Sequence, residues 1–582
     1  MAGNDKGLGS FALVLHAHLP YVISHGTWPH GTDWLNEAAA ETYIPLLNVF
    51  ERLVSEGISP KVTIDVSPIL AEMLSHRDFK PQFKKYLTDK IEAAKRDSAE
   101  FARINDSHMA SVSAMWEGFY STALESFTVK YNEDLIGAFR KLQDAGHIEI
   151  ATCGATHGYM PLLSRDISVQ AQIKQAVKAH TRHFGKPPRG IWLPECAYRP
   201  SYAWNKPVYD EEATPYHRKG VEEFLSENGI EYFFIDSHLL KGGRAAGVYM
   251  DRFSDLKVMW NNLDKSMKAL PETVEKTPRK VYYVAFGEQA IEGMMPVAVF
   301  TRDVKTGLQV WSGEWGYPGD GAYLDFHKKR FPGGLRYWRV TDAKADLADK
   351  QPYNPNGAIS KTPDHAAHFV GVVKDGLKDS KGGLVVSPYD CELFGHWWFE
   401  GPHWVYHVIK KMHEDGEVKA VTASEHLDSN RPSEMVSLPE GSWGEGGYHF
   451  IWLNDMNKWT WKHVYEAEKD MEELAAAHEH SGDAELIDML KQAARELLLL
   501  EASDWQFLIS TRAAADYAEL RVCRHYEDFK RLVSIIRKKA SAEALTDGDR
   551  NFFSDLKKRD SVFEDIELKW FSRVEHQRHA LK

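Results

Sequence analysis

Cysteine is scarce in this 582-residue chain, which has four, at 153, 196, 391 and 523. No two of them have the C-x-x-C spacing of a thiolate zinc site, and so few cannot form a disulfide framework. The first three lie beside motifs described below. Small size and burial explain them better than thiol chemistry does.

The sequence also lacks a long apolar segment and a basic cluster. Its start, MAGNDKGLGSFALVLHAHLPYV, has one short apolar run that leads into polar residues, which is typical of neither a signal peptide nor a spanning helix. We therefore expect a cytoplasmic protein with no membrane partner. The net charge of −13 and the absence of a basic patch predict no nucleic-acid partner.

Aromatic residues, by contrast, are abundant, with 18 tryptophans and an aromatic content of 12%. Some of these rings will fill a core. A flat indole is also a good platform for a sugar ring.

Short apolar, β-rich runs recur along the chain, and each ends in polar or aromatic residues. They lie at 11–20, 61–68, 147–161, 190–200, 231–238, 308–320, 383–398 and 418–427. Runs of this length are typical of strands buried on both faces of a parallel sheet, and helical patterns lie between them. The alternation predicts an α/β barrel, with its chemistry at the carboxyl ends of the strands.

Two regions depart from this alternation. A polar helical stretch predicts an insertion domain at 72–146, between the second and third strands. From 433 the pattern is all-helical, and one helix face carries Leu486, Leu490, Ala493, Leu497 and Leu500. We predict a discontinuous barrel at 1–71 and 147–432, and a C-terminal helical domain at 433–582. The long segment 237–307 is expected to form a mobile flap beside the site, with a surface excursion as the alternative.

Two acids follow apolar runs, Glu195 in GIWLPECAY and Asp390 in GLVVSPYDCE. A carboxylate pair at neighbouring strand ends suits glycoside cleavage, in which one acid attacks the anomeric carbon and the other protonates the leaving oxygen. Structural ion pairs with arginines are the alternative interpretation. The apolar strand before Asp390 predicts that burial raises the pKa of its carboxyl.

Histidines form a second group at the strand ends. His16 and His18, in HAHLP, are two residues apart and so lie on one side of a strand, while His157 follows the third run. An H-x-H pair with a distant acid could bind a metal, as in metal-dependent deacetylases and some mannosidases. Hydrogen bonding to sugar hydroxyls is the competing interpretation.

Five motifs resemble, in order, the conserved regions of glycoside hydrolase family 57: HAHLPYV, ATHGYMPLL, GIWLPECAY, SPYDCELFGHWWFEGP and GSWGEGGYHFIWLN. Together with VWSGEWGYPGDGAYLDFHKKR and SDWQFLIS, they look more like the family's α-1,4-glucan branching members than its amylases. The resemblance covers nearly the whole chain. It implies a (β/α)7 barrel, an inserted helical domain, a C-terminal helical domain at the glucan cleft, and retaining chemistry with no metal or organic cofactor.

The resemblance also implies residue roles. Glu195 is expected to be the nucleophile. Asp390 is expected to be the general acid/base, which protonates the departing chain and then activates the 6-hydroxyl of an acceptor. The residues expected to contact the glucan are His16, His18, Trp28, His157, Tyr249, Trp311, Trp443, Trp452 and Asp504. Arg302 is a further candidate, and the extended segment after Tyr249 departs from the family pattern.

The expected activity is the formation of α-1,6 branches on an α-glucan such as amylose, amylopectin or glycogen, by a monomer or small homo-oligomer. Three alternatives stay open. They are an amylase-like hydrolase of the same family, a metal-dependent deacetylase or mannosidase, and a glycan-binding protein without activity. The presence of both Glu195 and Asp390 speaks against the last.

Overall fold

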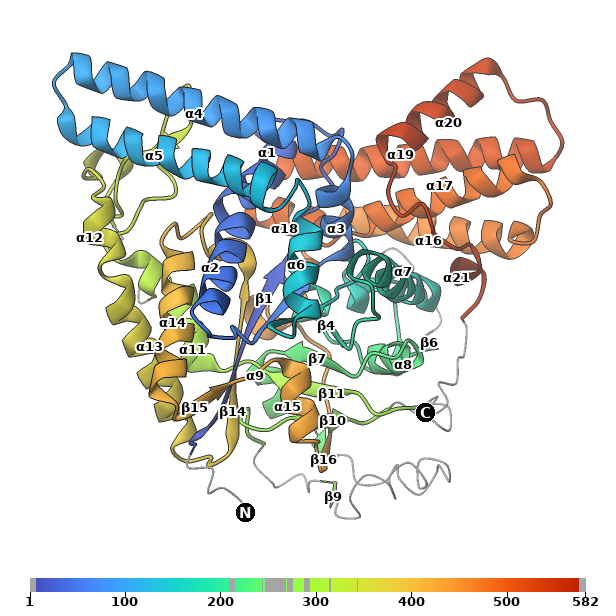
Figure 1. Ribbon diagram of the computed structural model, residues 1–582. Helices are drawn as coiled ribbons and strands as arrows, with labels where there is room; N and C mark the ends of the chain where they lie inside the picture. Colours follow the sequence, from blue (N-terminus) through green and yellow to red (C-terminus); the bar gives the residue numbers. More distant parts are fainter. Residues whose placement is uncertain are drawn as a thin grey trace.

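The computed structural model describes residues 7–208, 215–242, 244–245, 268–269, 276–286, 294–312, 316–342 and 344–574. Its centre is a barrel of parallel strands (Figure 1). In chain order these are β1 (Gly9–Ala17), β2 (Val62–Val66), β3 (Ile148–Ala151), β4 (Gly190–Ile191), β7 (Tyr232–Ile235), β11 (Ala298–Thr301) and β14 (Gly383–Asp390).

The seven strands close into a ring. One sheet runs β14-β1-β2-β3, and β4, β7 and β11 are neighbours in a second sheet. Parallel bridges join the two sheets, from Thr152 to Ile191 beside β3 and β4, and from Arg302 to Val386 beside β11 and β14. The predicted (β/α)7 barrel is confirmed.

The register of the strands places polar residues in one layer at their carboxyl ends. His16, near the end of β1, pairs with Asp390 on β14 and with Asp65 on β2. On β1 the residues from Phe11 to Leu15 are apolar and buried, and on β14 the residues from Leu384 to Tyr389 are buried, so burial fixes which residues reach the barrel mouth.

Helices surround the barrel (Figure 1). They include α2 (Ile44–Ser55), α6 (Leu135–Asp144), α7 (Asp166–Phe184), α8 (Val221–Glu227), α13 (Thr362–Leu377), α14 (Gly401–Asp415) and α15 (Ala423–Ser429). Helix α7 ends at Phe184 and is capped by Gly185, whose φ of 79° is the left-handed conformation that favours glycine at this position.

A helical hairpin extends from the barrel after β2 (Figure 1). It consists of α4 (Phe79–Arg103) and α5 (Ser107–Glu125), whose buried residues include Phe83 on α4 and Trp116 on α5. Both helices lie within the predicted insertion, whose domain boundaries stay a prediction.

The C-terminal region begins with a strand, β16 (Glu434–Ser437), which pairs with β10 (Tyr282–Val284), so it is not helical from residue 433 as expected. Its helices are α16 (Lys458–His478), α17 (Ala484–Leu500), α18 (Asp504–Thr511), α19 (Ala515–Ala540), α20 (Asp547–Arg559) and α21 (Lys569–Ser572). The apolar face predicted on α17 is confirmed, because all five of its residues are buried.

One predicted strand is wrong. The run at 308–320 begins inside a helix, α11 (Val304–Trp311). Its start is fixed by Asp303, whose side chain accepts a hydrogen bond of 2.8 Å from the Thr306 N–H. The barrel strand of this region is the earlier and shorter AVFT of β11.

The remaining α-helices and strands are short, and among them β15 (Val418–Ala420) extends the barrel sheet beside β1. They are α1 (Thr32–Ala38), α3 (Pro68–Ser75), α9 (Ser237–Gly242), α12 (Pro355–Ile359), β5 (Tyr202–Trp204), β6 (Tyr216–Arg218), β8 (Arg244–Ala245), β9 (Lys268–Ala269), β12 (Lys329–Arg330), β13 (Leu335–Arg336) and β15 (Val418–Ala420). Within the described part of the chain, a helix with the length and apolar character of a membrane span does not occur.

Candidate active site

The carboxyl ends of the strands open into a cleft of about 1680 Å³. This exceeds the roughly 300–1,000 Å³ of ordinary small-molecule pockets, as an extended ligand requires. Among its lining residues are His16, His18, Trp28, His157, Glu195, Trp311, Asp390, Trp443, Trp452 and Asp504. The structure therefore brings together every predicted site residue except Tyr249, which lies outside the described residues.

Glu195 sits in a tight turn that follows β4. Its φ of 61° and that of Cys196, 49°, both lie in the left-handed region that non-glycine residues seldom adopt. His157, in the loop after β3, has a φ of 63°. Such strained residues cluster at sites where the surrounding structure must hold a side chain in one direction.

Two donors hold the Glu195 carboxylate, which is 9% exposed. The Trp443 indole N–H donates to Oε2 at 2.9 Å, and the Ser503 hydroxyl lies 3.0 Å from Oε1. Burial raises the pKa of Glu195 to about 7 and the charge of Asp504 adds to this rise, while the bonds from Trp443 and Ser503 oppose it. The carboxyl is therefore partly ionised near neutral pH.

Asp390 ends β14 and is partly exposed to the cleft. Burial raises its pKa well above the ordinary range, the negative charges of Glu392 and Glu195 add to the rise, and the Arg302 guanidinium opposes it. The direction predicted from the sequence is thus confirmed. Arg302 is itself held by Asp236 at 2.8 Å.

The histidines form a stacked group beside Glu195. The rings of His18 and His157 lie 3.9 Å apart between centroids, and His16 stacks on His18 at 5.9 Å, so the prediction that His16 and His18 face one side is confirmed. His18 Nδ1 bonds the Ser67 hydroxyl at 2.9 Å, and Nε2 lies 3.1 Å from Asp504.

The other two rings have polar partners on both nitrogens. His16 contacts Asp65 through Nδ1 and His157 through Nε2, at 3.1 Å in the latter case. His157 Nδ1 lies 2.7 Å from the Ser503 hydroxyl. These nitrogens are therefore engaged within the protein.

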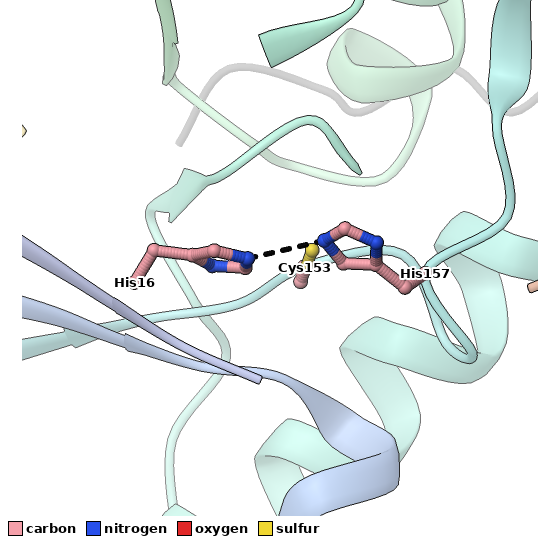
Figure 2. Close-up of side chains that lie close together, drawn as sticks. All are labelled: His16, Cys153 and His157. Atoms are coloured by element: carbon pink, nitrogen blue, oxygen red, sulfur yellow. Dashed lines mark hydrogen bonds between the residues drawn. The ribbon is translucent and has the colours of Figure 1, made fainter. Parts of the chain in front are cut away.

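Metal-ligating atoms also meet here. One nitrogen each of His16 and His157 and the thiol of Cys153 lie within 4.8 Å of one another (Figure 2). One nitrogen each of His18 and His157 and a carboxylate oxygen of Asp504 form a second group within the same distance. Burial lowers the pKa of both His16 and His157 and raises that of the Cys153 thiol, so the rings are neutral and the thiol is protonated. Because hydrogen bonds already satisfy the two rings, we interpret these atoms as hydrogen-bonding groups.

The predicted tryptophans differ in what they offer the cleft. Trp28 is 69% exposed at the rim, where it faces Phe331, which is 64% exposed, at 6.5 Å. Trp311 and Trp443 lie 6.4 Å apart beside the carboxylates. Trp452 is only 1% exposed and stacks on Tyr159, so it packs the cleft wall and does not present an open face.

Sequence reasoning missed Asp65, Glu392, Trp397 and Ser503. Asp65 had a signal, because an acid inside the apolar run KVTIDVSP requires a partner. Trp397 and Glu392 lie within the motif around Asp390, and Ser503 immediately precedes Asp504. Ser503 is the N-cap residue of α18, but its hydroxyl makes no capping bond and reaches Glu195 instead.

Comparison with known proteins identifies the family of the chain. Residues 12–439 match the model of glycosyl hydrolase family 57, and residues 463–571 match the C-terminal domain model of 1,4-alpha-glucan branching enzymes. The chain belongs to glycosyl hydrolase family 57. The resemblance noted in the five motifs is confirmed.

Similar proteins align with almost the full chain. The 1,4-alpha-glucan branching enzyme of Thermococcus kodakarensis is 39% identical over 96% of this chain and 78% of its own. The crystal structure of a branching enzyme of this family from Pyrococcus horikoshii matches with a TM-score of 0.85 at 37% identity, covering 98% of this chain and 97% of that one. An alpha-amylase from Thermotoga maritima matches with a TM-score of 0.78 at 28% identity, covering 98% and 100%.

Proposed function

We propose that this member of family 57 is a 1,4-alpha-glucan branching enzyme, a retaining glycosyltransferase that cleaves an α-1,4 link and rejoins the chain through an α-1,6 link. The observation that carries the proposal is the pair of carboxyls, Glu195 and Asp390, in one extended cleft. The relatives named as branching enzymes and the match of the C-terminal domain support the transfer reaction.

In the first step, Glu195 attacks the anomeric carbon of the donor glucan and forms a covalent glycosyl-enzyme. Asp390 gives its proton to the departing oxygen. The raised pKa of Asp390 supports this role because the carboxyl must hold a proton at neutral pH. The donors on both oxygens of Glu195 orient it for attack.

In the second step, Asp390 takes the proton from the 6-hydroxyl of an acceptor glucan. The oxygen of that hydroxyl then attacks the anomeric carbon and releases Glu195. Water competes for the same intermediate, so transfer requires that the acceptor occupy the cleft and exclude water. The exposed rings of Trp28 and Trp397 and the partly exposed rings of Trp311 and Trp443 are the proposed glucan platforms.

The C-terminal domain contributes directly to this site. Ser503 contacts Glu195, Asp504 contacts His18, and the Ser503 N–H donates to the His157 carbonyl at 3.0 Å. The barrel alone would therefore lack part of the wall around the nucleophile.

Hydrolysis is the second candidate, because the Thermotoga maritima alpha-amylase aligns with the whole chain. Proton NMR of amylose incubated with the purified protein separates the two by counting α-1,6 linkages against new reducing ends. We expect many branches and few reducing ends. Reducing ends without branches would overturn the proposal in favour of a hydrolase.

We also propose that the enzyme acts in the cytoplasm on amylose, amylopectin or glycogen, as a monomer or small homo-oligomer. The four unpaired cysteines, three of them buried, support a reducing compartment.

A further inference from the structure

A continuous line of polar contacts connects Glu195 to a fully buried acid on another strand. The Glu195 Oε1 atom lies 3.0 Å from the Ser503 hydroxyl, which lies 2.7 Å from His157 Nδ1. His157 Nε2 lies 3.1 Å from His16 Nε2, and His16 Nδ1 contacts Asp65. Figure 2 shows the central link, between the two imidazoles.

Each of these hydrogen bonds, called links below, contains one hydrogen, so the donor and acceptor of one link determine the donor and acceptor of the next. If Glu195 is ionised, Ser503 donates to it and accepts from the Nδ1–H of His157. The Nε2 atom of His157 then accepts from the Nε2–H of His16, whose Nδ1 accepts from protonated Asp65. If Glu195 is protonated, every link reverses and Asp65 carries the negative charge.

The surroundings favour the state in which Asp65 holds the proton. Its carboxyl is completely buried, and its Oδ1 atom has no hydrogen-bond partner among the described residues, so an ionised Asp65 would be poorly stabilised. Glu195 has a second donor, the Trp443 indole. Burial and the charge of Glu392 also raise the pKa of Asp65.

We propose that Asp65 is a positioning residue that keeps Glu195 ionised. It holds the proton that would otherwise neutralise Glu195, and it acts through His16, His157 and Ser503. Moving that proton passes one hydrogen across each of the four links and takes none from solvent. The proposal rests on the nucleophile role proposed for Glu195, and it assigns to the neutral histidines a task besides contacting the sugar.

Other titratable and charged groups face this line without being links in it. They are Glu392, Cys153 and Cys391 toward Asp65, His18 beside the two imidazoles, and Asp504, Asp390 and Cys196 toward Glu195. Changing one of them shifts the pKa of an end of the line but leaves the dependence of Glu195 on Asp65 in place.

The Asp65→Asn variant tests the coupling. In the wild type, protonating Glu195 while Asp65 keeps its proton reverses the line, so the strong O–H···N bond from Asp65 to His16 Nδ1 is replaced by a weaker one from the His16 N–H to the Asp65 carbonyl oxygen. The asparagine amide can turn its carbonyl oxygen toward His16, so Glu195 can accept a proton without this loss. We expect the acid limb of the kcat/KM profile to move up by about one pH unit.

Combining Asp65→Asn with substitutions at two serines distinguishes coupling between Asp65 and Glu195 from a local structural effect. Ser503→Ala interrupts the line, so Asp65→Asn should cause no further shift in that background, and Ser503→Thr should restore it. Ser67→Ala is the matched control, because Ser67 is also buried and hydrogen-bonded to a histidine, His18, that is not in the line. The shift should persist there.

A second measurement does not depend on activity. The infrared difference spectrum at neutral pH, wild type minus Asp65→Asn, should contain a protonated carboxyl band. An ionised carboxylate in its place, or an equal shift of the acid limb with and without Ser503, would overturn the proposal. If Glu195 is not the nucleophile, the infrared band would remain while the rate profile stayed unchanged, so the two failures are distinguishable.

Discussion

The Trp443→Phe variant isolates the hydrogen bond to the nucleophile. The indole N–H donates to Glu195 Oε2 at 2.9 Å, and this bond lowers the pKa of a carboxyl that burial has raised to about 7. Phenylalanine keeps an aromatic ring in the cleft but has no donor. The change therefore removes one charge-assisted bond while largely preserving the shape of the wall.

The magnitude follows from the strength of that bond. A hydrogen bond to a charged group contributes about 1.5–3 kcal/mol, which corresponds to roughly one to two units of pKa. The substitution should raise the pKa of Glu195, because the ionised carboxylate loses a hydrogen-bond donor. Below the two pKa values of Glu195, that of the wild type and that of the variant, the ionised fraction of Glu195 and with it kcat/KM should be about 10- to 100-fold lower in the variant. Far above both values the loss should disappear.

The assay is the initial rate of amylose consumption, followed by iodine staining and measured as kcat/KM from about pH 5 to about pH 9. Trp311→Phe is the matched control. Its ring lies 6.4 Å from that of Trp443, and its indole nitrogen has no hydrogen-bond partner within the described residues. A loss that is equal at all pH values, or a similar shift in the control, would refute the reasoning.

The same geometry leads to four further predictions. Glu392→Gln removes a negative charge that raises the pKa of Asp390, so the basic limb of kcat/KM should move to lower pH. Arg302→Gln removes an opposing positive charge, so that limb should move to higher pH. In either variant, a shift opposite to the expected one would contradict the role assigned to that residue. Trp28→Ala should change the free energy of unfolding by less than about 0.5 kcal/mol while lowering activity on long glucans. Trp452→Ala should destabilise the protein by about 3–5 kcal/mol in urea unfolding, because its ring is buried.

Much of the fold could be predicted because a barrel strand is buried on both faces and so appears as a continuous apolar run. This held for β1, β2 and β14, where the polar residues at the strand ends also marked the site. It failed at 308–320, where an aromatic, β-rich segment begins inside a helix because Asp303 caps it. Strand β11 has only four residues, and its apolar run is too short to identify it as a strand from the sequence.

The site was predictable where its residues lie inside long motifs, as Glu195 and Asp390 do. Hydrogen-bond partners from distant segments were not. Ser503 is 308 residues from Glu195 in sequence, and only the packing of α18 against the barrel brings its hydroxyl to the carboxylate. The burial of Trp452 likewise depends on tertiary contact, here with Tyr159, which the motif alone does not reveal.

The central claim, that Glu195 is the nucleophile and Asp390 the acid/base, can be tested by trapping the intermediate. The Asp390→Asn variant is incubated with an α-maltosyl fluoride, whose leaving group departs without a proton, so the first step proceeds while the second lacks its base. Peptide mass spectrometry after acid quenching locates the sugar. If Glu195 is the nucleophile, the peptide that contains it carries a maltosyl adduct, and an adduct on any other residue would contradict this role.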